Sequence, residues 1–302
     1  MPLVCFVTGT VYGIVDRETS YLIEALERRG IRSSVDAWDD PTVDWSRFDL
    51  AVNRTTSNYM FDPQKYLEWA RRAEKETAIW NPRGVLEWNI HKGYLLKLRT
   101  AGVPIPPTIL IKQGSEEPLG HHLDRTGWDE FVVKPAVTAG SFGLRKYGAA
   151  SPEAERHFRE LNREGYVQAA PDGTEYRCPP CDTIVQEYQP EIVEAGESSL
   201  IYFGGEYSHA MIKSPGSGDF RCHPMWGAEM RKHQATRGEL NIAEAALNAV
   251  GEPTEYARID ILETKRGPVI IEVELIEPNL FFNFFPKTVE SFSEYIAAFV
   301  LK

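Results

Sequence analysis

The chain has 302 residues, and 33 lysines and arginines against 44 aspartates and glutamates give it a formal net charge of −11. A negative charge of this size argues against general nucleic-acid binding, which depends on a cationic surface. Hydrophobic residues make up 42% of the chain and charged residues 25%, a balance typical of a folded globular protein. The apolar runs are too short to span a bilayer, no secretory signal is visible, and four cysteines do not indicate a disulfide framework. We therefore expect a soluble protein of the cytoplasm.

Strands and helices alternate over roughly the first quarter of the chain. The segment Leu3–Val7 is wholly apolar, as in a strand that is covered on both faces. Three further strands and two helices follow, at Thr19–Arg29 (helix), Ile31–Val35, Leu50–Val52, Pro63–Lys75 (helix) and Ala78–Trp80. This alternation predicts a small α/β domain with a mostly parallel sheet.

The rest of the chain has a different pattern, in which strands follow one another in pairs. Hairpins are expected for 198–213, turned at Gly204 and Gly205, and for 256–275. Single strands are expected at Thr108–Ile111, Phe131–Lys134 and Thr183–Tyr188, and helices at Ile90–Ala101, Pro152–Arg163, Glu239–Val250 and Glu290–Leu301. We expect α+β structure with antiparallel sheets here.

The last predicted hairpin places three acidic side chains on one surface. Glu272 and Glu274 alternate with apolar residues, so the period of two puts both on one face of their strand. A turn centred near Arg266 would pair Asp260 with Glu272, and Arg258 with Glu274. Like charges across a ladder destabilise it, so the cluster requires a cation, and carboxylate oxygens suit Mg²⁺. The alternative is a half-buried strand that shows its acids to water.

Three lysines lie where a phosphate group would explain them. Asn89 is a suitable N-cap for a helix from Ile90, which would place Lys92 in the first turn, where a cation opposes the helix dipole. A bound phosphate would reverse that effect. Lys134 ends an apolar strand before a glycine-containing loop, and Lys213 ends another strand before a second such loop. A solvated surface charge is the alternative for each lysine taken alone.

These segments, in their order along the chain, resemble the ATP-grasp superfamily, which includes D-alanine–D-alanine ligase and glutathione synthetase. The matching segments are Trp88–Lys92, Phe131–Pro135 with the glycine loop after it, Val185–Tyr188, Arg258–Asp260 and Ile271–Glu274. The resemblance implies an α/β N-terminal domain (1–88), a central ATP-grasp subdomain with the lysines and the glycine loop (89–188) and a C-terminal subdomain with magnesium-binding acids (189–302). It also implies a nucleotide cleft between the two α+β lobes.

The resemblance assigns nucleotide-binding roles to individual residues. Lys92 and Lys134 correspond to the lysines that hold the ATP phosphates. The flexible loop that closes over the phosphates would contain Gly140, Ser141 and Gly143. The hinge that meets adenine, largely through backbone groups, would be Gln186, Glu187 and Tyr188, and the ribose would be held by one of Glu191, Glu194 and Glu197.

The resemblance also implies the metal ligands and the reaction. Asp260, Glu272 and Glu274 match the magnesium ligands, although many members have Asn where this chain has Glu274. The family uses ATP to phosphorylate a carboxylate, and a nucleophile then attacks the acyl phosphate. The candidate catalytic residues around the transferred phosphoryl group are Arg221, Arg258 and Lys213.

Three runs resemble one subgroup of this family, which contains O-ureido-D-serine cyclo-ligase, the enzyme that forms D-cycloserine. They are Lys213–Pro215, Gly218–Arg221 and Glu272–Phe281, and the segment Trp88–Lys92 points to the same subgroup. The subgroup activates the substrate carboxylate and lets the substrate's own nitrogen close a ring. An intermolecular ligase that joins a carboxylate to an amine is the alternative, and a nucleotide-binding module without catalysis is a further one.

The substrate is expected to meet the strand end in the first domain. Arg54 could pair with a carboxylate in a bidentate manner, while Ser57, Asn58 and Tyr59 could form hydrogen bonds. Asp16 could hold an ammonium group, but an aspartate that caps a helix entry is the favoured interpretation.

Two further features of the sequence give weaker predictions. Cys178 and Cys181 have the spacing of zinc ligands, but without a regular second pair, so two reduced thiols in a loop fit equally. The aromatic run Phe281–Phe285 predicts core packing or a contact between two copies in a homodimer, and it could also line a substrate pocket.

Overall fold

The computed structural model describes residues 1–11, 16–169 and 174–302. Its first sheet is parallel, as predicted, with the strand order β2–β1–β3–β4. These strands are β1 (Leu3–Thr8), β2 (Arg32–Ala37), β3 (Leu50–Thr55) and β4 (Ala78–Trp80). The helices around this sheet are α1 (Arg17–Arg28), α2 (Pro63–Ala73), α3 (Arg83–Asn89) and the C-terminal α9 (Pro286–Val300).

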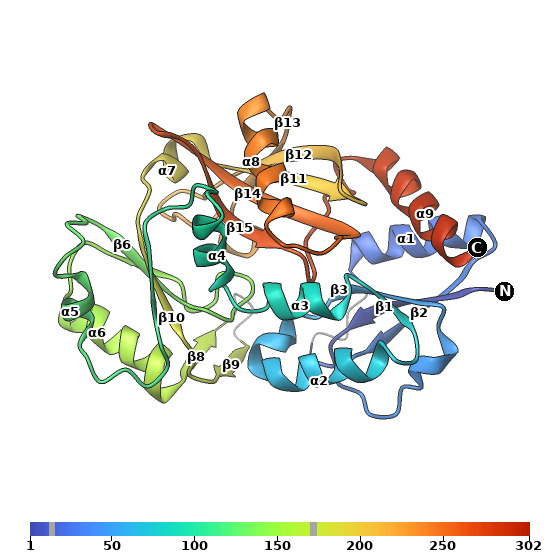
Figure 1. Cartoon of the computed structure of the whole chain (residues 1–302), viewed down its shortest axis with the longest axis horizontal. Helices are drawn as coiled ribbons and strands as arrows, with labels where there is room; N and C mark the ends of the chain where they lie inside the picture. Colours follow the sequence, from blue (N-terminus) through green and yellow to red (C-terminus); the bar gives the residue numbers. More distant parts are fainter. Residues whose placement is uncertain (12–15, 170–173) are drawn as a thin grey trace.

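The apolar strand β1 is covered on both faces. Val4 and Phe6 pack in one core with residues of α1 and α9, whereas Cys5 and Val7 pack in another with residues of α2 and α3. The end of the chain therefore returns to the first sheet, where α9 lies beside α1 (Figure 1). The domain boundaries predicted near residues 88 and 188 stay a prediction.

The second sheet is antiparallel, with the order β5–β10–β6–β7. Its strands are β5 (Thr108–Ile111), β6 (Phe131–Pro135), β7 (Arg145–Tyr147) and β10 (Thr183–Glu187). Helix α6 (Pro152–Arg159) packs on it through Ala154 and Phe158, and α5 (Leu119–Leu123) lies next to α6. A separate hairpin, β8 (Tyr166–Ala169) and β9 (Glu175–Cys178), was not predicted, nor was β7.

The third sheet is antiparallel and has five strands in the order β13–β12–β11–β14–β15. They are β11 (Glu197–Phe203), β12 (Glu206–Ser214), β13 (Glu229–His233), β14 (Tyr256–Thr264) and β15 (Gly267–Glu274). Both predicted hairpins are confirmed, and Gly204 and Gly205 take the positive φ angles that the first turn requires. The core of this sheet contains residues of α8 (Arg237–Asn248) and α4 (Tyr94–Thr100), while α7 (Glu191–Ala195) contacts β12 and β14.

The helix predicted from Ile90 to Ala101 is wrong at its start. Helix α3 already ends at Asn89, and α4 begins at Tyr94, so Asn89 caps no helix. Its side-chain amide instead donates to the carbonyl of Val273 (2.7 Å) and accepts from the backbone N–H of Leu275 (2.9 Å). Asn89 thus joins the α3–α4 connection to the end of β15, which brings Lys92 close to the acidic hairpin.

The aromatic run after β15 belongs to the core. Phe281 and Phe282 are buried beside α1 and α9, and Phe284 and Phe285 pack against the same cluster. This confirms the core interpretation of the run and gives no support to a subunit contact. None of the helices in the described residues is long and apolar enough to cross a membrane.

Candidate active site

A cavity of about 330 Å³ lies between the segment after β3, the second sheet and the third sheet. Sixteen of the predicted site residues line it: Ser57, Tyr59, Lys92, Lys134, Gly140, Ser141, Gln186, Glu187, Tyr188, Glu197, Lys213, Arg221, Arg258, Asp260, Glu272 and Glu274. Six do not: Asp16, Arg54, Asn58, Gly143, Glu191 and Glu194. Segments far apart in the sequence therefore converge on one cavity, while the roles predicted for these residues stay predictions.

The three predicted acids meet on β14 and β15. Asp260 lies opposite Glu272, and Arg258 opposite Glu274, which is the predicted register. One carboxylate oxygen from each of Asp260, Glu272 and Glu274 lies within 4.8 Å of the others. Three hard oxygen donors at this separation fit Mg²⁺. Cys178 and Cys181 take part in no comparable cluster among the described residues, and both thiols are free.

A β-bulge changes one detail of this face. The register shifts between Asp260 and Ile261, so that Ile261 pairs with Ile270. Ile270 is consequently buried in the core, while Ile271 turns to line the cavity beside Glu272. The strict alternation expected for β15, with Ile271 on the face opposite the glutamates, is wrong at this point. The bulge adds an apolar surface next to the carboxylates.

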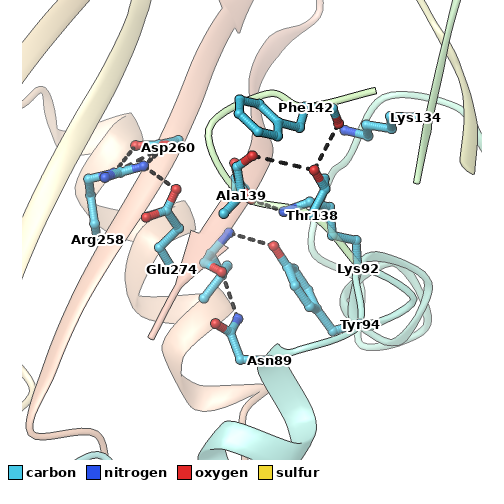
Figure 2. Close-up of polar contacts among 12 residues, drawn as sticks. Asn89, Lys92, Tyr94, Lys134, Thr138, Ala139, Phe142, Arg258, Asp260 and Glu274 are labelled. Carbon is cyan, nitrogen blue, oxygen red and sulfur yellow. Dashed lines mark hydrogen bonds and ion pairs between the residues drawn. The ribbon is translucent and has the colours of Figure 1, made fainter. Parts of the chain in front are cut away.

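Arg258 and Lys213 hold the acids together. The Arg258 guanidinium donates to Asp260 (2.9 Å) and also forms an ion pair with Glu274, and these side chains point toward one another in Figure 2. The Lys213 ammonium lies 3.1 Å from Asp260 and 2.5 Å from Glu197. Burial alone would raise the pKa of Asp260, but the charges of Arg258 and Lys213 outweigh burial and lower it. Asp260 is therefore held as a carboxylate.

Glu274 has a different electrostatic setting. Burial raises its pKa to about 7, because Arg258 offsets only part of that effect and the neighbouring charges of Glu272 and Asp260 add to it. The negative charges of Glu272 and Asp260 lie beside Glu274, so Arg258 and Lys213 do not fully balance the negative charge of the cluster. A divalent ion among the three acids would remove this deficit.

The two predicted phosphate lysines differ in their partners. Lys92 forms an ion pair with Glu272 and its backbone N–H donates to Ala136 (2.7 Å). It lies between α3 and α4, so the predicted conflict with a helix dipole does not exist. Lys134 instead donates to the Gln186 side chain (3.2 Å) and has no ion pair among the described residues. Burial lowers the pKa of Lys134 to about 8, although Glu272 partly offsets this.

The predicted glycine loop follows β6. Gly140, Ser141 and Gly143 all have positive φ angles, of 60°, 62° and 70°. A side chain at Gly143 would meet the Pro135 ring at 2.7 Å, so Gly143 shapes the loop without lining the cavity. The Trp226 indole N–H, in the 3₁₀ turn η4 (Pro224–Trp226), donates to the carbonyl of Gly140 (3.0 Å). This bond ties the glycine loop to the C-terminal lobe.

The predicted adenine hinge lines the cavity but is partly engaged within the protein. The backbone N–H of Glu187 donates to Pro107 (2.9 Å), and that of Tyr188 donates to Glu130 (3.0 Å). These two donors, expected to meet adenine, are therefore used by the fold. Of the three ribose candidates, Glu197 is buried in the cavity wall, whereas Glu194 is exposed outside it. Glu191 lies in α7 near the backbone N–H of Lys265.

Arg221 lines the cavity from the loop after β12. Its guanidinium pairs with Asp219 (2.6 Å) and lies 3.6 Å above the centre of the Trp226 ring. The ion pair and the cation–π contact fix the orientation of the side chain. Arg221 is thus presented to the cavity from the same loop that contacts Gly140.

Three predicted substrate residues have structural roles instead. Arg54 is buried, pairs with Glu18 (2.8 Å) and donates to the carbonyl of Pro278 (3.1 Å). Asn58 is buried, accepts from the Trp38 indole (2.6 Å) and donates to Asp39 (2.9 Å). Asp16 accepts from the backbone N–H of Thr19 (2.7 Å), so it is the N-cap of α1. These contacts correct the substrate roles predicted for Arg54 and Asn58, and they confirm the helix-capping interpretation that was favoured for Asp16.

The sequence predictions missed several residues of the cavity wall. Glu277, Cys222 and His223 line the cavity beside the predicted residues. Burial lowers the pKa of His223 to about 4, and the charges of Lys213 and Arg258 add to this. Glu277 could have been predicted from the sequence, because it lies three residues after Glu274 within the segment Glu272–Phe281 that resembles the family.

Comparison with known proteins shows the family. The family model for the N-terminal domain of D-cycloserine synthetase DcsG matches residues 4–81. The chain is 30% identical over 293 residues to the cycloserine biosynthesis protein DcsG of Streptomyces lavendulae, and the match covers 93% of each chain. This chain belongs to the D-cycloserine synthetase family of ATP-grasp ligases. The crystal structure of D-cycloserine synthetase DcsG superposes with a TM-score of 0.82 at 28% identity, over 99% of both chains.

More distant structures show the same fold. The RimK domain ATP-grasp protein of Sphaerobacter thermophilus matches with a TM-score of 0.68 at 18% identity, over 99% of this chain and 100% of that one. The D-alanine–D-alanine ligase of Bacillus anthracis, solved with ATP, matches with a TM-score of 0.69 at 14% identity, over 100% and 98%. The predicted ATP-grasp fold is confirmed, and this D-cycloserine synthetase family member is an ATP-dependent ligase that forms C–N bonds.

Proposed function

We propose that this enzyme uses ATP to close the ring of O-ureido-D-serine and so forms D-cycloserine. The observation that carries the proposal is the match to the Streptomyces lavendulae DcsG protein over 93% of both chains. It is supported by a cavity in which Lys134, which has no ion pair among the described residues, faces a three-acid cluster. The amino-acid substrate and the phosphates of ATP would meet between this lysine and the acid cluster.

The acid cluster would hold the metal ion. Asp260, Glu272 and Glu274 would bind Mg²⁺, which neutralises charge on the phosphate oxygens when it is bound. Lys213 and Arg258 have a positioning role, because their ion pairs keep Asp260 charged and fix its carboxylate. The glutamate at position 274 adds a negative charge where many family members have Asn, and its pKa is raised even though Arg258 forms an ion pair with it.

The reaction follows from the groups that the cavity brings together. The substrate carboxylate attacks the γ-phosphorus of ATP, and ADP leaves. The nitrogen bonded to the substrate's side-chain oxygen then attacks the activated carbonyl carbon, and phosphate leaves. D-Cycloserine carries no carbamoyl group, so water must also hydrolyse the bond between the ureido nitrogen and its carbamoyl carbon. The nitrogen keeps a proton, and the released carbamate breaks down to CO₂ and ammonia. Lys92, Lys134 and Arg221 would hold the phosphate oxygens, and Arg258 would reach the transferred group.

The glycine loop and the apolar wall would exclude water from the acyl phosphate. Trp226 fixes the loop carbonyl of Gly140, and Ile271 lies beside the acids. An acyl phosphate is hydrolysed by water, so a closed cavity favours attack by the nitrogen of the same molecule. An enzyme of this kind works in the cytoplasm, where ATP is available.

The decisive experiment supplies O-ureido-D-serine with ATP and Mg²⁺ and detects products by mass spectrometry, with ADP measured in parallel. The proposal predicts D-cycloserine and ADP in equal amounts. ADP release only after an amine or a second amino acid is added, with a linear product, would instead establish the intermolecular ligase. Nucleotide binding without ADP release from any amino-acid-like carboxylate would establish the non-catalytic module.

A further inference from the structure

Glu277 is an acidic side chain of the cavity without a cationic partner. It lies three residues beyond Glu274, past the end of β15, and lines the cavity. Across residues 1–11, 16–169 and 174–302, no lysine, arginine or histidine forms an ion pair with it. The four acids that line the cavity from the third sheet all have such a partner: Glu197, Asp260, Glu272 and Glu274. Glu277 is therefore the acid of this wall whose charge no ion pair within the described residues neutralises.

The positive charge of Arg54 lowers the pKa of Glu277, but the guanidinium of Arg54 forms its ion pair and hydrogen bond with other groups. Its guanidinium is buried, pairs with Glu18 (2.8 Å) and donates to the carbonyl of Pro278 (3.1 Å). Burial raises the pKa of Glu277 to about 8, the charge of Glu274 adds to this, and Arg54 lowers it only in part. A carboxylate in this setting gains most from a positive charge supplied from the cavity.

The first domain orients the Glu277 carboxylate. Hydrogen bonding from the backbone N–H of Thr56 and from the Ser57 hydroxyl lowers its pKa, so both donors face it. The Tyr59 ring is also close, because Glu277 exerts the largest charge effect on the pKa of that phenol after burial. These neutral groups, on and just before the 3₁₀ turn η2 (Ser57–Phe61), fix the carboxylate without cancelling its charge.

The place of Glu277 relative to the acid cluster defines the ligand. The charge of Glu274 acts on Glu277, so the cluster and Glu277 are neighbours along the cavity wall. A carboxylate that receives the γ-phosphoryl group must lie against the cluster, and an α-amino acid carries its ammonium group on the next carbon. We propose, on the basis of the proposed function, that Glu277 binds this α-ammonium group and restricts the enzyme to α-amino acids.

A metal ion at Glu277 fits the structure less well. The group of three acids whose oxygens approach within 4.8 Å contains Asp260, Glu272 and Glu274 but not Glu277. An ammonium group needs only one carboxylate and further hydrogen-bond acceptors nearby, and the Ser57 and Tyr59 hydroxyls also line this part of the wall. The site is thus built for an organic cation from the substrate.

The experiment compares two substrates in three proteins. The substrates are O-ureido-D-serine and its analogue in which hydrogen replaces the α-amino group. The proteins are the wild type, Glu277→Gln, which keeps the size of the side chain, and Glu206→Gln, an exposed matched control at the start of β12. The measured quantities are kcat and KM for each substrate, from ADP release, and KM for ATP.

The wild type and the control are expected to use the amino substrate and to reject the analogue. In Glu277→Gln, KM for the amino substrate should rise about tenfold to a hundredfold, because a charged hydrogen bond is lost, while KM for ATP stays within about twofold. The ratio of kcat/KM between the two substrates should fall by the same factor. A loss of folding or positioning alone would lower kcat/KM for both substrates by the same factor. An unchanged ratio of the two kcat/KM values would therefore overturn the proposal.

Failure of the proposed function gives a different result. If O-ureido-D-serine yields no ADP, the same comparison is made with D- and L-amino acids and their counterparts without the amino group. Glu277 retains its assigned role if only amino acids release ADP and if Glu277→Gln removes that preference. Equal use of a carboxylic acid without an amino group would overturn the role of Glu277, and no ADP from either set would overturn both proposals.

Discussion

Two lysines face the same cavity from opposite sheets, in opposite electrostatic settings; Lys213 is buried and Lys134 is half-buried. Lys213, on β12 of the third sheet, lies between Glu197 and Asp260, and these charges raise its pKa even though burial acts to lower it. Lys134, on β6 of the second sheet, has the Gln186 amide oxygen as its partner, and burial lowers its pKa to about 8. Side chains of the protein neutralise Lys213, whereas Lys134 has no ion pair among the described residues.

This difference separates the two walls of the cavity. On the third sheet, charged side chains satisfy one another and define the geometry of the acid cluster. On the second sheet, Lys134 is half-buried and has no ion pair among the described residues, and a partly desolvated cation without an anion costs folding free energy. We therefore expect substitutions on the third-sheet wall to reduce stability, and substitutions on the second-sheet wall to reduce ATP use.

The largest effect is expected from Lys213→Met. The substitution leaves Glu197 and Asp260 buried without their shared cation, and breaking a buried ion pair costs about 3–5 kcal/mol. Urea unfolding should show this loss as a lower midpoint. The exposed Lys112→Met is the control, since its side chain is 80% exposed. An unchanged midpoint for Lys213→Met would remove the structural difference between the two lysines.

Lys134→Ala should act on turnover instead. Removal of one preorganised positive donor from the transferred phosphate should lower kcat/KM for ATP about a hundredfold or more. The melting temperature should stay the same or rise, because a half-buried charge with no ion pair among the described residues is removed. Lys97→Ala, at an exposed position of α4, serves as the control. Near-wild-type turnover at a normal melting temperature would contradict the phosphate role of Lys134.

The pH dependence of ATP binding sharpens the same comparison. Because the pKa of Lys134 is about 8, its ammonium form is fully present below that pH and is lost as the pH rises through it. KM for ATP should therefore rise up to about tenfold per pH unit above pH 8. Lys134→Arg stays charged and should abolish this rise. A wild-type profile that is flat up to pH 10 would show that Lys134 keeps its proton.

A smaller effect is expected from Glu272→Gln. One of the three charged oxygens of the acid cluster becomes neutral, so the Mg²⁺ concentration at half-maximal activity should rise several-fold. Glu263→Gln, an exposed change near the end of β14, is the control. Titration curves that coincide for Glu272→Gln and the wild type would remove Glu272 from the metal ligands.

The hairpin could be predicted from the sequence because its information is local. The period of two and a short turn near Arg266 were enough to pair Asp260 with Glu272, as observed. The bulge could not be predicted, because Ile270 and Ile271 are equally apolar and only the tertiary packing decides which of them enters the core.

The predictions for Arg54 and Asn58 failed because the partners of these residues lie far along the chain. Glu18 lies 36 residues from Arg54, and Asp39 lies 19 residues from Asn58, so the sequence alone did not show that these side chains were already engaged. The error at Lys92 was avoidable, since Gly93 interrupts the predicted helix and marks the start of α4. Local patterns thus predicted the elements and the acid cluster, while long-range ion pairs decided which polar residues remain for the substrate.

The most direct test of the central claim is a crystal structure with Mn²⁺ in place of Mg²⁺ and a non-hydrolysable ATP analogue. Anomalous scattering from Mn²⁺ locates the metal independently of the protein. We predict a metal peak among Asp260, Glu272 and Glu274, with the analogue's phosphates between that peak and Lys134. A metal bound elsewhere, or phosphates that do not reach Lys134, would contradict the account.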